Sequence, residues 1–154
     1  SYFSAVQTEK NAMFIILCLI VMVAAFGLLS SMYMVVTEKR RDIAILRTMG
    51  MTRRQIGQIF LTQGLTFGAF GTVLGVGLGI LIAVNVPAIM AFLERHTGYA
   101  LPAQMYFINE LPAKIDPAVI SGISIVTLIL TLLFSVIPAL MAARTEPARA
   151  LSHE

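Results

Sequence analysis

Long apolar runs separated by short polar segments dominate the chain. Three runs contain no Asp, Glu, Lys or Arg, and they cover residues 11–37, 55–93 and 117–143. Each run exceeds the ~20 residues that an apolar helix needs to cross the hydrocarbon core of a bilayer. We therefore predict an all-α integral membrane protein with three transmembrane helices, at about 12–36, 55–93 and 117–143.

The polar segment between the first two runs has its own helical pattern. Ile43, Leu46 and Met49 recur at every third position, as expected for apolar side chains near one face of a helix. Gly50 suits the left-handed conformation that often ends a helix. This spacing predicts a short amphipathic helix over about 38–50.

Polar residues also mark the starts of the second and third spans. Thr52 and Gln55 match the S/T-x-x-E/Q capping box that begins many helices. Asp116 followed by Pro117 provides a cap and a proline at the first helical position. Residues 94–116 are then predicted to be the loop between these two spans.

Basic residues gather in two places that the predicted spans bring to one side. Six of the eleven Lys and Arg residues lie within 39–54, and Arg144 and Arg149 lie in the C-terminal tail. By the positive-inside rule these segments face the cytoplasm, whereas the N-terminus of the chain and the loop 94–116 face the outer side. Because topology explains the net charge of +3, we predict no nucleic-acid partner.

The middle run is long enough for either one helix or two short spans. As a single helix it would measure about 58 Å, against a hydrocarbon core of about 30 Å. Two spans would place the basic tail outside and the less basic loop 94–116 in the cytoplasm, against the positive-inside rule. We therefore predict one long helix that extends beyond the bilayer.

Glycine concentrates on one face of this middle helix, within an arc of about 80°. The six glycines are Gly57, Gly64, Gly68, Gly71, Gly75 and Gly79. Glycine destabilises a helix by about 1 kcal/mol relative to alanine in water, so a glycine face indicates close packing of another helix. That helix can belong to this chain or to a second membrane subunit, and both possibilities stay open.

The composition excludes several kinds of chemistry. Charged residues make up only 12% of the chain, against roughly 25% in ordinary globular domains, and none lies inside a predicted span. Cys18 is the only cysteine, and His96 and His153 have no partners at ligand spacing. No phosphate-binding loop is present. We therefore predict no catalytic residue, no metal site and no cofactor in this chain.

Several stretches resemble the membrane subunits of the lipoprotein-releasing ABC transporter, the LolC/LolE type. The similar stretches are residues 11–14, 37–54, 84–95, 106–112 and 142–151. The resemblance covers the whole chain but only the last three spans of that family, so residues 1–154 are interpreted as the C-terminal three-span portion, an FtsX-like permease domain. The stretch 106–112 favours the Lol type over related permeases.

The resemblance implies roles for particular residues. Residues 38–50 would be the coupling helix that docks on an ATPase subunit. Its expected contact residues are Lys39, Arg40, Arg41, Asp42, Ile43, Leu46, Arg47, Met49 and Gly50. The first span would line a lipoprotein cavity through Phe14, Leu17, Val21 and Phe26. The periplasmic loop would contribute Tyr106, Phe107, Leu111 and Pro112.

The resemblance also implies partners and a location. The expected partners are LolD-type ATPase subunits that bind ATP and Mg²⁺, a second LolC/LolE-type membrane subunit, which is either the same chain or a paralogue, acylated lipoprotein cargo and the lipid bilayer. A periplasmic LolA-type carrier would bind a part of the protein that precedes Ser1. The location would be the bacterial inner membrane, with the N-terminus of the chain in the periplasm and the C-terminus in the cytoplasm.

Two other functions remain as alternatives. One is an FtsX-type transmembrane signal transmitter in cell division, and the other is a MacB-type exporter of hydrophobic compounds. For the segment 38–50, the residues alone also allow simple attraction to anionic lipid, worth about 1 kcal/mol for each basic residue near the surface.

Overall fold

In the computed structural model, which describes residues 1–98 and 115–152, every regular element is a helix. The helices are α1 (Tyr2–Glu38), α2 (Arg40–Thr48), α3 (Arg53–Thr97), α5 (Pro117–Ala143) and α6 (Pro147–Leu151). The predicted all-α fold is therefore confirmed for this part of the chain. The predicted loop residues Tyr106, Phe107, Leu111 and Pro112 lie outside the described residues.

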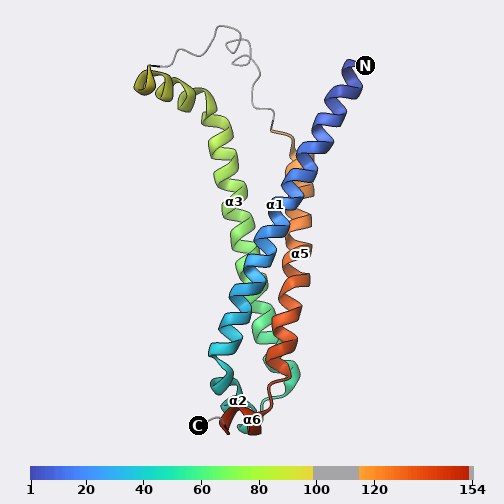
Figure 1. Ribbon diagram of the computed structural model, residues 1–154, viewed down its shortest axis with the longest axis vertical. Coiled ribbons are helices and arrows are strands. Elements are labelled where there is room, and N and C mark those ends of the chain that lie inside the picture. Colours follow the sequence, from blue (N-terminus) through green and yellow to red (C-terminus); the bar gives the residue numbers. More distant parts are fainter. Residues whose placement is uncertain (99–114, 153–154) are drawn as a thin grey trace.

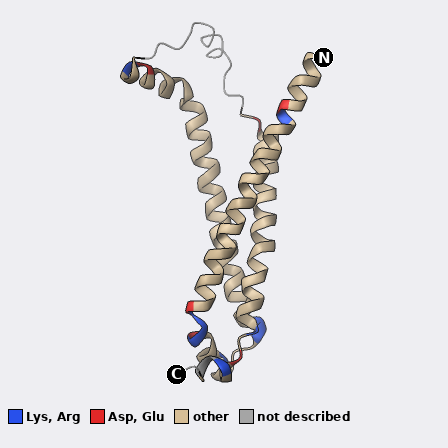
Figure 2. Cartoon of the chain, in the orientation of Figure 1, with Lys and Arg blue, Asp and Glu red and all other residues tan. Residues whose placement is uncertain are grey.

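Three of these helices, α1, α3 and α5, are long and apolar enough to cross a membrane. The charged residues lie towards the two ends of the molecule and leave the middle of the bundle without charge (Figure 2). The middle apolar run forms the single helix α3, as predicted, and α5 matches the predicted third span. Helix α1 begins at Tyr2, well before the predicted residue 12.

Helix α5 holds the bundle together because it packs along both α3 and α1. Helices α1 and α3 make few contacts with each other and diverge towards the end that carries the N-terminus (Figure 1). At the opposite end, α2 and α6 pack against each other. We call this second end the basic end, because eight of the eleven Lys and Arg residues lie in the segments 39–54 and 144–149.

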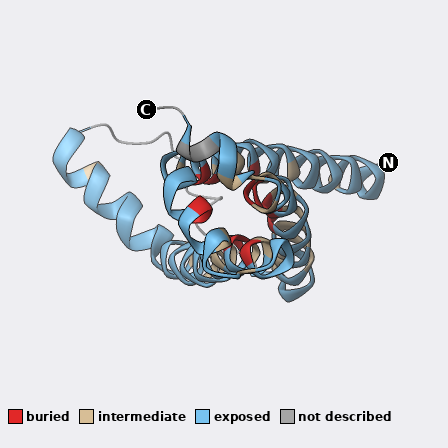
Figure 3. Ribbon diagram, turned by 90° about the horizontal axis from the view of Figure 1, so that it is seen from below, coloured by how far each residue is buried: buried red, intermediate tan, exposed pale blue. Residues whose placement is uncertain are grey.

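The buried core lies near the basic end, where all three long helices converge. It consists of Met32, Val36, Ile43, Ile56, Phe60, Ala139 and Ala142. Seen from the basic end, buried residues lie on the inner sides of the helices and exposed residues cover the outer sides (Figure 3). No residue of the most apolar window of α3 is buried within the chain, so this large apolar surface requires lipid or another membrane chain around it.

The helix ends follow the predicted capping residues. The Thr52 hydroxyl accepts a hydrogen bond from the backbone N–H of Gln55 at 3.3 Å, and the Thr52 N–H donates to the Gln55 side chain at 3.0 Å. Asp116 caps α5 by accepting from the N–H of Ala118 at 3.0 Å. Gly50 adopts a φ of +105°, which glycine tolerates and most other residues do not. Gly50 and the Thr52–Gln55 capping box together define the short turn between α2 and α3.

Helix α3 contains Pro87, and its last turns bend away from α1 and α5 (Figure 1). Proline has no N–H for the carbonyl four residues earlier, and its ring clashes with that carbonyl, so it bends a helix. Nearby, the side-chain amide of Asn85 donates to the Leu81 carbonyl at 2.8 Å. The bend turns the overhanging end of α3 outward and widens the space between the helices.

Candidate functional site

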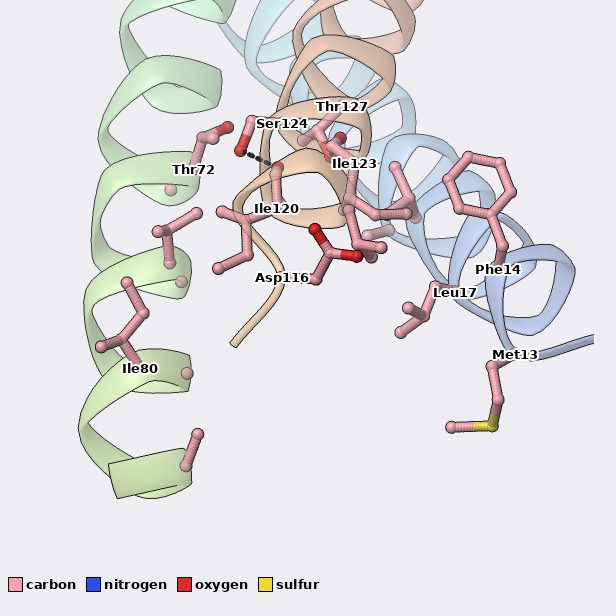
Figure 4. A pocket seen from close by; sticks show the side chains of 18 of the residues that line it. Met13, Phe14, Leu17, Thr72, Ile80, Asp116, Ile120, Ile123, Ser124 and Thr127 are labelled. Carbon is pink, nitrogen blue, oxygen red and sulfur yellow. Dashed lines mark hydrogen bonds between the residues drawn. The ribbon is translucent and has the colours of Figure 1, made fainter. Parts of the chain in front are cut away.

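The divergence of α1 and α3 leaves a large cavity between the three long helices. Its volume is about 1140 Å³, slightly above the roughly 300–1,000 Å³ of common ligand pockets. Leu17 from α1, Ile80 from α3 and Ile120 from α5 surround the same space (Figure 4). The cavity therefore exists because α5 contacts both neighbours while the neighbours separate from each other.

The glycine face of α3 is divided between packing and cavity. A Cβ atom added to Gly64 would lie 2.7 Å from the Cβ of Ser135, and one added to Gly68 would lie 2.9 Å from the Cβ of Thr131. These two glycines therefore allow α5 to pack directly on the α3 backbone. Farther along α3, a Cβ on Gly71, Gly75 or Gly79 would meet nothing within 4 Å, and these three glycines line the cavity.

Several hydroxyl groups of the cavity wall donate hydrogen bonds to backbone carbonyls of their own helices. The hydroxyl of Thr72 donates to the Gly68 carbonyl at 2.7 Å, that of Ser124 to Ile120 at 2.8 Å, and that of Thr127 to Ile123 at 2.7 Å. A hydroxyl that donates within its own helix presents little unsatisfied polarity to a ligand. The wall is therefore suited to an apolar ligand, with Glu9, Lys10 and Asp116 as its charged residues.

Three of the four predicted cavity residues of α1 line this cavity, namely Phe14, Leu17 and Val21. The prediction is wrong for Phe26, which does not line it. Phe26 lies about 140° around the helix from Val21, and its ring packs edge-on against the ring of Phe134 with centroids 5.0 Å apart. The nearly uniform apolar character of α1 hid this difference in the sequence.

Helix α2 corresponds to the predicted amphipathic helix, but its apolar stripe is divided. Ile43 is only 3% exposed and belongs to the core of this chain, so the expectation that Ile43 docks on a partner is corrected. Leu46 and Met49 remain 37% and 78% exposed. Each step of three residues along an α-helix moves the side chain by about 60° around the helix axis. Met49 is two such steps from Ile43 and therefore points in a different direction.

The remaining residues of the predicted coupling surface form a charged rim at the basic end. Lys39 and Asp42 form an exposed ion pair at 3.8 Å, which contributes little stability. Arg40 is exposed as well, and Gly50 ends the segment. Whether these residues contact an ATPase stays a prediction. The packing of α6 against α2 was not predicted, because the tail has no apolar period long enough to indicate it.

The sequence is similar to known membrane permeases. The FtsX-like permease C-terminal family model matches residues 14–147. The lipoprotein-releasing system transmembrane protein LolC of Neisseria meningitidis is 45% identical over 155 residues, which are 100% of this chain and 37% of the relative. LolE of Haemophilus influenzae is 34% identical over 96% of this chain and 36% of its own length. The chain thus spans a little over a third of these relatives.

A more distant relative is the uncharacterized ABC transporter permease YknZ of Bacillus subtilis. It is 28% identical over 133 residues, which are 86% of this chain and 29% of that protein.

Proposed function

The chain belongs to the FtsX-like permease family, and from this premise we propose that it is part of a membrane subunit of an ATP-driven transporter that releases lipoproteins from the bacterial inner membrane. The similarity to LolC along the whole chain supports this function. Residues 1–154 contain no phosphate-binding loop. The proposal therefore includes separate LolD-type ATPase subunits, a second LolC/LolE-type membrane subunit, and a cytoplasmic basic end.

The observation that carries the proposal is the apolar cavity between α1, α3 and α5. Its volume of about 1140 Å³ and its satisfied hydroxyl groups suit a flexible hydrocarbon group better than a polar solute. The cavity lies among helices that have the length and composition of membrane spans. An acyl chain anchored in a bilayer could therefore enter it sideways without passing through water.

The core at the basic end provides a mechanical link between α2 and the cavity. Ile43 of α2 shares one buried cluster with Met32 of α1, Phe60 of α3 and Ala139 of α5. Since close-packed side chains transmit displacement, a push on α2 would move all three helices that form the cavity wall. Leu46 and Met49 remain exposed and are our candidates for contact with the ATPase.

Site-specific photo-crosslinking in membranes tests the cargo site. A photo-reactive amino acid at Leu17, which lines the cavity, should capture an acylated lipoprotein. The same group at Phe26 is the matched control, because Phe26 lies on the same helix and outside the cavity. Capture at Phe26 but not at Leu17 would contradict the proposed cargo site. Capture at neither position, while the protein remains inserted and bound to its ATPase, would contradict the transport of lipoproteins.

A further inference from the structure

A second, smaller groove lies between α3 and α5 at the basic end. Its volume is about 430 Å³. The lining residues are Arg53, Arg54, Gly57, Gln58, Leu61, Val136, Ala139, Leu140, Ala143 and Arg144. All of them belong to α3, to α5 or to the residue that caps α5. Because none comes from α1, α2 or α6, the groove is distinct from the central cavity and from the α2 surface.

Small residues form the floor of this groove and larger apolar residues form its sides. A Cβ added to Gly57 would lie 3.6 Å from the Ala139 carbonyl oxygen and 3.6 Å from the Ala143 Cβ, so the two helices approach closely along the floor. Val136 and Leu140 are 36% and 51% exposed. An extended apolar chain could therefore lie along the groove in contact with both helices.

Three arginines surround the mouth of the groove. Arg53 and Arg54 begin α3, and Arg144 directly follows α5. All three are exposed, and within residues 1–98 and 115–152 no carboxylate forms an ion pair with any of them. The nearest acid in sequence to Arg144 is Glu146, and it pairs with Arg149 at 3.5 Å. The mouth therefore carries an uncompensated positive charge.

The arginines lie at one end of the apolar groove, so the charged group and the hydrocarbon chain of one amphiphilic molecule could bind there together. Along α3, Leu61 lies about 10 Å deeper than Arg54 at 1.5 Å per residue. The charge-free stretches of both helices begin at this point, so the arginines stand at the boundary between the apolar and polar zones. A guanidinium group can donate two parallel hydrogen bonds to two oxygens of one phosphate group.

We propose that this groove binds an anionic phospholipid of the leaflet at the basic end. The phosphate group contacts Arg53, Arg54 and Arg144, and the upper part of one acyl chain lies along Leu61, Val136 and Leu140. The net negative charge of the lipid offsets part of the positive charge of the three arginines, whereas a zwitterionic lipid brings no net charge. The proposal requires only that the protein is inserted in a membrane, and it does not depend on the transport of lipoproteins.

Native mass spectrometry of the detergent-purified protein tests this site with two probes, phosphatidylglycerol and phosphatidylcholine. In the triple variant Arg53→Gln, Arg54→Gln and Arg144→Gln, binding of phosphatidylglycerol should weaken about tenfold or more. Binding of phosphatidylcholine should stay within about twofold, because it depends little on net charge. The matched control Lys39→Gln, Arg40→Gln and Arg47→Gln removes the same charge from residues 39–47, and it should leave phosphatidylglycerol binding within about twofold because none of these residues lines the groove.

Two results would overturn the proposal. Unchanged phosphatidylglycerol binding in the triple variant would show that the arginines hold no lipid. An equal loss in both variants would show a general attraction of the basic end and no defined groove. A photo-reactive amino acid at Leu140, with the arginines intact, provides a measurement that does not depend on the folding of the variants. A phospholipid adduct there supports the site, whereas an adduct only with another protein chain refutes it.

Discussion

Gly64 of α3 lies directly against Ser135 of α5, and a single methyl group should disrupt this contact. A Cβ at position 64 would lie 2.7 Å from the Ser135 Cβ and even closer to its hydroxyl oxygen. Ser135 is completely buried, and its hydroxyl has no hydrogen-bond partner in this part of the chain. Gly64→Ala must therefore push α3 and α5 apart.

The expected cost can be separated from the general effect of alanine in a helix. Overpacking of a tight contact costs about 1–3 kcal/mol, while replacing glycine by alanine in a helix stabilises it by up to about 1 kcal/mol. Gly75→Ala should show only the stabilisation of the helix by alanine, because nothing lies within 4 Å of a Cβ at position 75. The difference between the two variants should therefore equal the packing cost of about 1–3 kcal/mol. For a chain of this size this corresponds to a Tm difference of about 2–12 °C.

Thermal unfolding in detergent, followed by circular dichroism, measures this difference. The variant Ser135→Gly removes both atoms that lie closer than 3 Å to the new methyl group, so Gly64→Ala should have no packing cost in that background. Equal Tm values for Gly64→Ala and Gly75→Ala would refute the reasoning. The same conclusion would follow if Ser135→Gly failed to reduce the cost of Gly64→Ala.

Two other predictions concern coupling and the shape of α3. Leu46→Glu or Met49→Asp should abolish lipoprotein release from reconstituted vesicles while the protein stays inserted, because both exposed side chains are our candidates for contact with the ATPase. Met49→Leu is the control. Normal release in the acidic variants would contradict the coupling role. Pro87→Ala should straighten α3, so that the distance between spin labels at Ile59 and Leu93, measured by electron paramagnetic resonance, rises towards the about 51 Å of a straight helix. An unchanged distance would show that Pro87 does not cause the bend.

Much of the fold followed from the sequence because the bilayer imposes strict conditions on a chain. A span must be helical and uncharged for about 20 residues, and the three charge-free runs satisfied that condition without any knowledge of packing. The starts of α3 and α5 were equally predictable, since a cap depends on neighbouring residues. Thr52 with Gln55 and Asp116 with Ala118 form the expected local hydrogen bonds.

The predicted cavity residues of α1 came from the family resemblance, because a helix that is apolar all round has no pattern that selects one face. Phe14, Leu17 and Val21 line the cavity, whereas Phe26 points elsewhere. On α2 the spacing identified an apolar stripe, but Ile43 at its start faces the core and Met49 at its end faces out. The spacing of apolar residues along a helix shows which of them share a face, but it does not show what that face contacts.

From the sequence alone it was possible to predict the class of the protein, the number of spans, the capped starts of α3 and α5 and the concentration of basic charge near residues 39–54. Only the tertiary structure decided how the glycine face is used. Gly64 and Gly68 contact α5, while Gly71, Gly75 and Gly79 open to the cavity. The physical reason is that α1 and α3 diverge while α5 holds both, so identical residues on one face meet a helix at one level and empty space at the next.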